Sequence, residues 1–228
     1  GYTAAVYAAR ANLKPVLAFL DQLSQNNNKP WFDQNRPAYT AARGAFEQFV
    51  DGVIDEFREV DGLQDLAAGA CMPRINRDVR FSKDKSPYKT NLGALVAPGG
   101  WRATAQGYYI ALQPHGQSMV AGGLYDPTPQ QLDRFRQAVV RDAAGFRQIV
   151  QAPDFVAVFG GVEGARLKTA PKGYDRDHPA IDLLQLKQIL AMRRFPDEEV
   201  LAPDFSARVV AACRAMRPFL KYLDTLLA

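Results

Sequence analysis

The chain has 228 residues, of which 47% are apolar and 23% charged, and its formal net charge is +4. This composition is typical of a globular protein with a sizeable core, and no apolar run approaches the roughly 20 residues of a membrane-spanning helix. The two cysteines lie far apart in the sequence, which favours a reducing compartment over a disulfide framework. We therefore expect a cytoplasmic protein without a membrane partner.

Residues 1–10 are weakly patterned and do not begin with Met. They lack the basic, apolar and small-residue order of a signal peptide. Because they do not begin with Met, we interpret them as an N-terminal extension, left by a leader or a tag. Helical periodicity covers residues 13–23 and returns, with an aromatic stripe, over residues 39–60. Between these helices, Pro30 suits the first turn of a short helix, and Pro37 interrupts or re-initiates the longer one.

The pattern then changes to short apolar runs bounded by Gly/Pro turns, which indicates an antiparallel meander. The expected strands cover residues 75–81, 91–97, 107–113 and 117–125. Thr128 and Pro129 suit the N-cap and the first position of a following helix.

Three more helical segments and one further strand or helix complete the expected elements. The helical segments cover residues 154–159, 182–187 and 204–227, and residues 189–195 fit a strand or a helix. This order predicts an α+β fold, a single domain over residues 11–228 with a mainly antiparallel sheet covered by helices.

The excess positive charge of the chain lies in residues 74–89, which contain six cations and only two anions. If this segment begins as a strand, Asn76, Asp78 and Arg80 share one polar face. Three lysines then follow near the strand end: Lys83, Lys85 and Lys89. Converging Arg and Lys side chains suit phosphate, carboxylate or a nucleic-acid backbone, because they supply bidentate donors and mobile point charges.

The same segment also permits a purely structural interpretation. Asp78 and Asp84 could pair with neighbouring cations and hold a solvated loop in shape. Phe81, Tyr88 and the rigid Ser86–Pro87 pair favour an ordered loop over a frayed one.

Two further polar stretches could complete a pocket. In the first, Asn28, Lys29 and Arg36 could supply donors beside the basic segment, or Asn28 could cap a helix whose Trp31 is buried. The second stretch contains Lys172 and His178. His178 lies among aspartates in the sequence and could act as a general base. The alternative for this histidine is a turn residue that satisfies local backbone.

Several familiar chemistries find no support in the sequence. Two histidines and two scattered cysteines do not make a standard zinc site, and no GxGxxG, P-loop or GxSxG motif is present. We therefore expect no metal and no cofactor.

Three segments resemble the signature segments of a family of conserved hypothetical proteins from bacteria and fungi, known only as a domain of unknown function. They are Asn-Asn-Asn-Lys-Pro-Trp-Phe-Asp-Gln-Asn-Arg (residues 26–36), Arg-Asp-Val-Arg-Phe-Ser-Lys-Asp-Lys-Ser-Pro-Tyr-Lys-Thr (77–90) and Leu-Lys-Thr-Ala-Pro-Lys-Gly-Tyr-Asp-Arg-Asp-His-Pro (167–179). The resemblance extends from about Val16 to Leu227 and implies a single domain, without implying an activity. Pro37 departs from the pattern, which expects a helix-compatible residue there.

We expect a protein that binds an anionic small molecule in a basic polar pocket, either as a binding protein or as a metal-independent enzyme. The expected ligand-binding residues are Asn28, Lys29, Trp31, Arg36, Arg77, Arg80, Lys83, Lys85, Tyr88, Lys89 and Lys172. The candidates for proton transfer are Asp78 and His178. The alternatives are a nucleic-acid-binding protein that contacts phosphates through residues 74–89, and an interaction module in which this segment is a structural ion network. The oligomeric state is left open.

Overall fold

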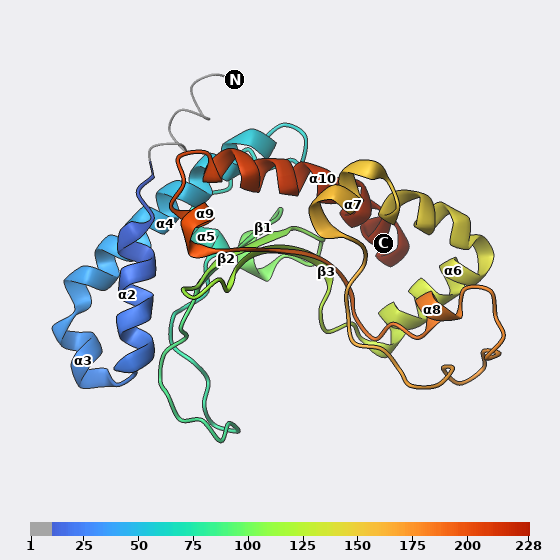
Figure 1. Ribbon diagram of the computed structural model, residues 1–228, viewed down its shortest axis with the longest axis horizontal. Coiled ribbons are helices and arrows are strands. Elements are labelled where there is room, and N and C mark those ends of the chain that lie inside the picture. The colour runs from blue at the N-terminus through green and yellow to red at the C-terminus, as the bar shows by residue number, and fades with distance from the viewer. Residues whose placement is uncertain (1–10) are drawn as a thin grey trace. The chain divides into compact units, whose positions relative to one another are not determined.

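The computed structural model of the protein describes residues 11–228, and the N-terminal extension expected at residues 1–10 lies outside them (Figure 1). The structure combines helices with one four-stranded antiparallel sheet, so the α+β prediction is confirmed. The described chain divides into two compact units. The first unit contains residues 11–104, 108–120 and 194–211, and the second contains residues 105–107, 121–193 and 212–228.

The helices of the first unit are α2 (Lys14–Gln25), α3 (Lys29–Gln34), α4 (Arg36–Phe57), α5 (Ala68–Cys71), the 3-10 helix η1 (Gly100–Arg102) and α9 (Asp197–Val200). Three of them, α2, α3 and α4, carry a proline in their first turn. The Asn28 side chain caps α3 by accepting the N–H of Trp31 at 2.9 Å. Pro37 lies in the first turn of α4, so it re-initiates the helix, because this position needs no N–H donor.

The core of the first unit is the aromatic stripe of α4. Phe46, Phe49 and Phe57 are at most 1% exposed. Phe49 stacks on Phe205 with ring centroids 5.3 Å apart, and Phe205 in turn meets the ring of Phe195 edge-on. Full burial of such rings contributes roughly 1.5–3 kcal/mol each, so the stripe anchors the helix to this unit.

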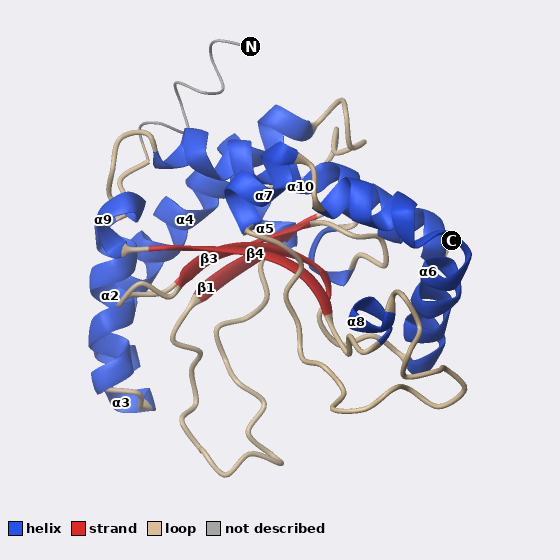
Figure 2. Ribbon diagram, turned by 45° about the vertical axis from the view of Figure 1, so that its right-hand side comes forward, coloured by secondary structure: helices blue, strands red, loops and turns tan. Residues whose placement is uncertain are grey.

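The strands, which are red in Figure 2, are hydrogen bonded in the order β1-β2-β3-β4. Their bounds are Leu92–Val96 for β1, Tyr108–Leu112 for β2, Ser118–Leu124 for β3 and Ile189–Phe195 for β4. The β1–β2 register pairs Leu92 with Leu112 and Leu95 with Tyr109. The β2–β3 turn has positive φ at both His115 and Gly116, as a tight hairpin requires. These strands confirm the predicted meander and settle residues 189–195 as a strand.

The predicted strand at residues 75–81 is wrong. The segment makes a single bridge, Asn76 to Tyr88, and otherwise runs as a loop. Asp78 explains part of the difference, because its carboxylate accepts the N–H of Arg80 at 3.2 Å and so competes with a strand ladder. The opposite arm contains Pro87, which has no N–H to donate. The polar face inferred from strand alternation is therefore absent from this segment.

The second unit is built around three helices: α6 (Pro129–Val150), α7 (Pro153–Phe159) and α8 (Ile181–Leu184). Thr128 and Gln131 form a reciprocal capping box at the start of α6, as the sequence predicted for Thr128. The last helix, α10 (Phe205–Leu227), runs from the first unit into the second. Within residues 11–228, no helix combines the length and the apolar character needed to cross a membrane.

Candidate functional site

Residues 74–89 form a long loop that is closed at its base. The N–H of Arg77 donates to Pro87 O and the N–H of Lys89 donates to Ile75 O, both at 2.8 Å. Asn27, which precedes α3, extends this pairing: its amide donates to Tyr88 O at 2.9 Å and accepts the Tyr88 N–H at 3.1 Å. The base of the loop is therefore fixed to the chain between α2 and α3.

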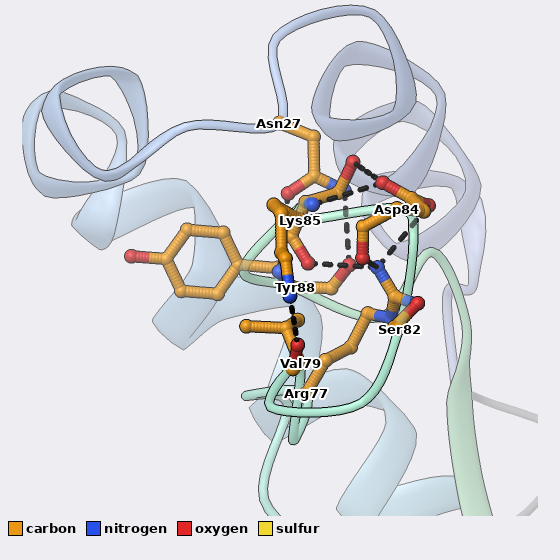
Figure 3. A network of polar contacts seen from close by, with 8 residues as sticks. Asn27, Arg77, Val79, Ser82, Asp84, Lys85 and Tyr88 are labelled. Atoms are coloured by element: carbon orange, nitrogen blue, oxygen red, sulfur yellow. Dashed lines mark hydrogen bonds and ion pairs between the residues drawn. The ribbon is translucent and has the colours of Figure 1, made fainter.

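Tyr88 anchors the loop from the apolar side. Its ring points away from the polar groups of the loop (Figure 3) and stacks on Phe32 with centroids 4.1 Å apart. Only 6% of Tyr88 is exposed, so its ring packs within the fold while its backbone holds the loop in place. A part for Tyr88 in ligand binding stays a prediction.

Arg77 and Asp84 organise the interior of the loop (Figure 3). The Arg77 guanidinium donates to Ser86 O at 2.8 Å and forms an ion pair with Asp84 at 3.1 Å. The Asp84 carboxylate accepts the N–H of Ser86 at 2.9 Å and its hydroxyl at 2.6 Å. These bonds from Ser86, followed by the nearby Arg77, lower the pKa of Asp84. Lys85 donates to Val79 O at 2.8 Å, so Arg77 and Lys85 both hold the loop in shape.

The tip of the loop is exposed. Arg80 binds Asp78 through both of its carboxylate oxygens, at 2.9 and 2.7 Å. This hydrogen bonding lowers the pKa of Asp78, which makes the carboxylate a weaker proton acceptor than an ordinary aspartate. Phe81 is 95% exposed, and Lys83 has no hydrogen-bond or ion-pair partner among residues 11–228.

A cavity of about 610 Å³ lies between the base of this loop and the β1–β2 pair of the first unit. It is lined by polar, cationic and aromatic side chains together. They include Asn27, Arg74, Asp84, Lys89, Thr90, Trp101 and Tyr109. Gly93 of β1 also lies in the wall.

The cavity brings two uncompensated cations together. Burial, followed by the neighbouring Arg74 guanidinium, lowers the pKa of Lys89. The Lys89 ammonium donates to the backbone carbonyl of Arg74, whereas the Arg74 guanidinium has no hydrogen-bond or ion-pair partner among the described residues. Asp84 is the one carboxylate in the lining, and Arg77 and Ser86 already bind it. Two adjacent like charges without a free carboxylate favour an anion between them.

The predicted donors of α3 serve the helix itself. Lys29 and Arg36 both pair with Asp33, at 2.5 and 2.9 Å, and hydrogen bonds from these two cations lower the pKa of Asp33. Trp31 stacks on Phe19 with centroids 5.9 Å apart, and Asn28 is the cap described above. None of these four predicted residues is in the cavity lining.

Lys172 and His178 belong to the second unit. Lys172 lines a separate cavity of about 570 Å³, together with the cations Arg136 and Lys187. His178 Nδ1 accepts the N–H of Ala180 at 3.0 Å, which is the local backbone role that the sequence offered as its alternative. A part for Lys172 or His178 in ligand binding or proton transfer stays a prediction.

The sequence interpretation missed several of the residues that line the cavity, among them two polar and two aromatic residues. Arg74 lies inside the basic segment but was not singled out, and Asn27 is one residue before the chosen Asn28. Trp101 follows a Pro-Gly-Gly turn, which marks it as a ring held on a tight turn. Tyr109 gave no local signal, because only the pairing of β2 with β1 brings it to the cavity.

Neither a metal site nor a reactive cysteine is present among the described residues. No group of three or more His, Cys, Asp or Glu side chains in residues 11–228 could hold a metal ion. Cys71 and Cys213 are both buried, and burial raises the pKa of Cys71 to about 11. Cys71 is therefore a packing residue with little thiolate at neutral pH.

The fold and the cavity define an α+β protein with a basic, aromatic-lined pocket in its first unit. A model of the family described as conserved hypothetical protein (DUF2461) matches residues 15–222. The chain belongs to this family, which confirms the expected family membership. No curated protein and no solved structure matches the chain.

Proposed function

We propose that the cavity of the first unit binds a small molecule through an anionic group, such as a phosphate or a carboxylate. The observation that carries this proposal is the Arg74–Lys89 pair. The two cations are close enough for Arg74 to depress the pKa of Lys89, and the only carboxylate in the lining is held by Arg77. An anion placed between them relieves this repulsion and gains charge-assisted hydrogen bonds.

The size and polarity of the cavity support a small ligand. Its volume of about 610 Å³ falls within the roughly 300–1,000 Å³ of small-molecule sites. Asn27 and Thr90 supply neutral donors and acceptors in the lining, which can orient the rest of the ligand. The low pKa of Asp84 keeps its carboxylate charged, so it accepts hydrogen bonds and does not donate a proton. Binding is thus better supported than acid–base catalysis.

Nucleic-acid binding is the second candidate, and the exposed loop tip is the observation that favours it. Phe81 is 95% exposed beside the unpartnered Lys83, and exposed aromatic rings next to cations can stack on unpaired bases. Binding to phosphates along a strand would weaken steeply with salt, with a logarithmic slope of about −0.7 per phosphate on single strands. A flat salt dependence of oligonucleotide binding would reject this candidate.

Calorimetric titration with inorganic phosphate and with acetate tests the leading proposal. We expect binding by the unaltered chain, and a loss of about 10-fold or more in affinity for Arg74→Met and for Lys89→Met, since each variant removes a charge-assisted contact of roughly 1.5–3 kcal/mol. Lys83→Met is the matched control, because it removes the same charge from the same loop outside the cavity. Equal losses in all three variants, or no binding of either anion, would contradict the proposal.

A further inference from the structure

Trp101 is held at the cavity by a rigid turn. It belongs to η1, and the two residues before it, Gly99 and Gly100, have φ values of 89° and 70°. The N–H of Gly100 donates to Ala97 O at 2.8 Å. A Cβ on Gly100 would lie 2.3 Å from Ala70 O, so only glycine fits there. The turn therefore fixes the place from which the indole extends.

Tyr109 forms a second fixed ring of the same cavity. It lies on β2, opposite Leu95 of β1, and its side chain crosses to Gly93 of β1. A Cβ on Gly93 would lie 2.8 Å from the Tyr109 hydroxyl and 3.2 Å from its ring atoms. The missing side chain at Gly93 thus leaves room for the tyrosine ring to lie against the strand. The Tyr109 and Trp101 ring centroids are 6.4 Å apart.

The exposure of Trp101 argues against a purely structural role. Tyr88 and Trp101 both line the cavity, but Tyr88 is 6% exposed, whereas Trp101 is 41% exposed. An indole that is held on a rigid turn, lines a cavity and is partly exposed presents a planar apolar surface to whatever enters. Stacking of a base on an aromatic side chain strengthens binding roughly 5- to 150-fold.

We infer that the ligand of this cavity carries a planar ring in addition to its anionic group, and that the ring lies against Trp101 and Tyr109 while Arg74 and Lys89 hold the anion. A nucleoside monophosphate, whose base is joined to the phosphate through the sugar, has this chemistry, and so does an aromatic carboxylate. The inference rests on the proposed function, because it adds a ring subsite to the anion subsite. It limits the ligand to molecules that carry a planar ring and one anionic group, which separates them from sugar phosphates and aliphatic acids.

Pairs of probes that share an anion and differ in the ring test this inference. The full chain is titrated calorimetrically with adenosine 5′-monophosphate against ribose 5-phosphate, and with benzoate against acetate. We expect the ring-bearing member of at least one pair to bind about 10-fold more tightly. Trp101→Ala should remove that difference and leave the affinity for the ringless probe unchanged. Trp101→Phe, which keeps a ring, should retain most of it.

The outcomes distinguish the ring subsite from the anion subsite. If ringed and ringless probes bind equally and Trp101→Ala changes neither, the ring subsite is overturned while anion binding stands. If no probe binds, the proposed function fails as well. If adenosine binds as tightly as its monophosphate, the anion subsite is wrong. A far-ultraviolet circular dichroism melt of Trp101→Ala identifies a folding defect, in which case Trp101→Phe and the probe pairs on the unaltered chain decide the result.

Discussion

Replacing Arg77 by methionine should loosen the loop of residues 74–89 and destabilise the fold. Arg77 is the residue that closes the loop from within, through Ser86 O at 2.8 Å and the Asp84 carboxylate at 3.1 Å. Two weaker contacts, to Asp84 O and to the Ser82 hydroxyl, are both 3.4 Å long. Methionine keeps most of the length of the side chain and removes every donor.

The expected magnitude follows from the strong carbonyl contact and from the exposure of the side chain. A hydrogen bond from a charged donor contributes about 1.5–3 kcal/mol when it is shielded, and the Arg77 side chain is 27% exposed. The acceptor carbonyl of Ser86 can be rehydrated if the loop opens, which limits the loss. We therefore expect the free energy of unfolding to fall by about 1–2 kcal/mol.

Urea unfolding and limited proteolysis check this prediction. The unfolding midpoint should fall, and cleavage within residues 77–86 should become faster, because the loop opens more often. Arg80→Met is the matched control: Arg80 also pairs with an aspartate, but its side chain is 76% exposed, so we expect no measurable change. An unaltered midpoint and unaltered cleavage in Arg77→Met would refute the idea that Arg77 shapes the loop.

Three further predictions concern a turn, an ion pair and a titrating lysine. Gly100→Ala should lower the free energy of unfolding by several kcal/mol, because its Cβ would meet a backbone oxygen at positive φ. Gly44→Ala, which has open space around its Cβ in α4, should raise the free energy of unfolding by roughly 0.5–1 kcal/mol in the same urea assay. Destabilisation by Gly44→Ala alone would contradict this reasoning. The hydrogen bond from Arg147 lowers the pKa of Asp182, so this carboxylate stabilises the fold above the ordinary aspartate pKa, and that contribution is lost as the pH falls through its lower folded value. Asp182→Asn should therefore lower the free energy of unfolding by at most about 0.5–1 kcal/mol at pH 7, since the pair is solvent-screened, and this loss should shrink as the pH falls; a loss that does not change with pH would exclude the ion pair as its cause. Phosphate affinity should fall as the pH rises through the lowered pKa of Lys89, below the ordinary lysine value of about 10.4, and an affinity that stays constant up to that ordinary value would remove Lys89 from the site.

The sequence predicted most elements because their signals are local. The helix at α6 begins at the Thr128–Pro129 cap, and the β2–β3 hairpin turns at Pro114-His115-Gly116. The strand expected at residues 75–81 failed for a physical reason. Its apolar alternation was real, but a strand needs a partner along its length, and the partner arm contains Pro87 and turns held by Asp84.

The candidate site was predicted as a region and not as a set of residues. Charge counting found the basic segment, yet it could not separate cations that only hold the loop, such as Lys85, from cations that line the cavity, such as Arg74 and Lys89. That distinction depends on which acceptors lie within reach after folding. Tyr109 and Gly93 were beyond any sequence pattern, because their contact arises from the β1–β2 register.

The most direct test of the central claim is a nuclear magnetic resonance titration of the lysine side chains with inorganic phosphate. We predict that the Lys89 Cε and Nζ resonances shift with phosphate and that the pKa of Lys89, which burial and Arg74 lower in the free protein, rises on binding. The exposed Lys83 should move little. Resonances of Lys83 that shift as much as those of Lys89, or a Lys89 pKa that phosphate leaves unchanged, would contradict an anion site in this cavity.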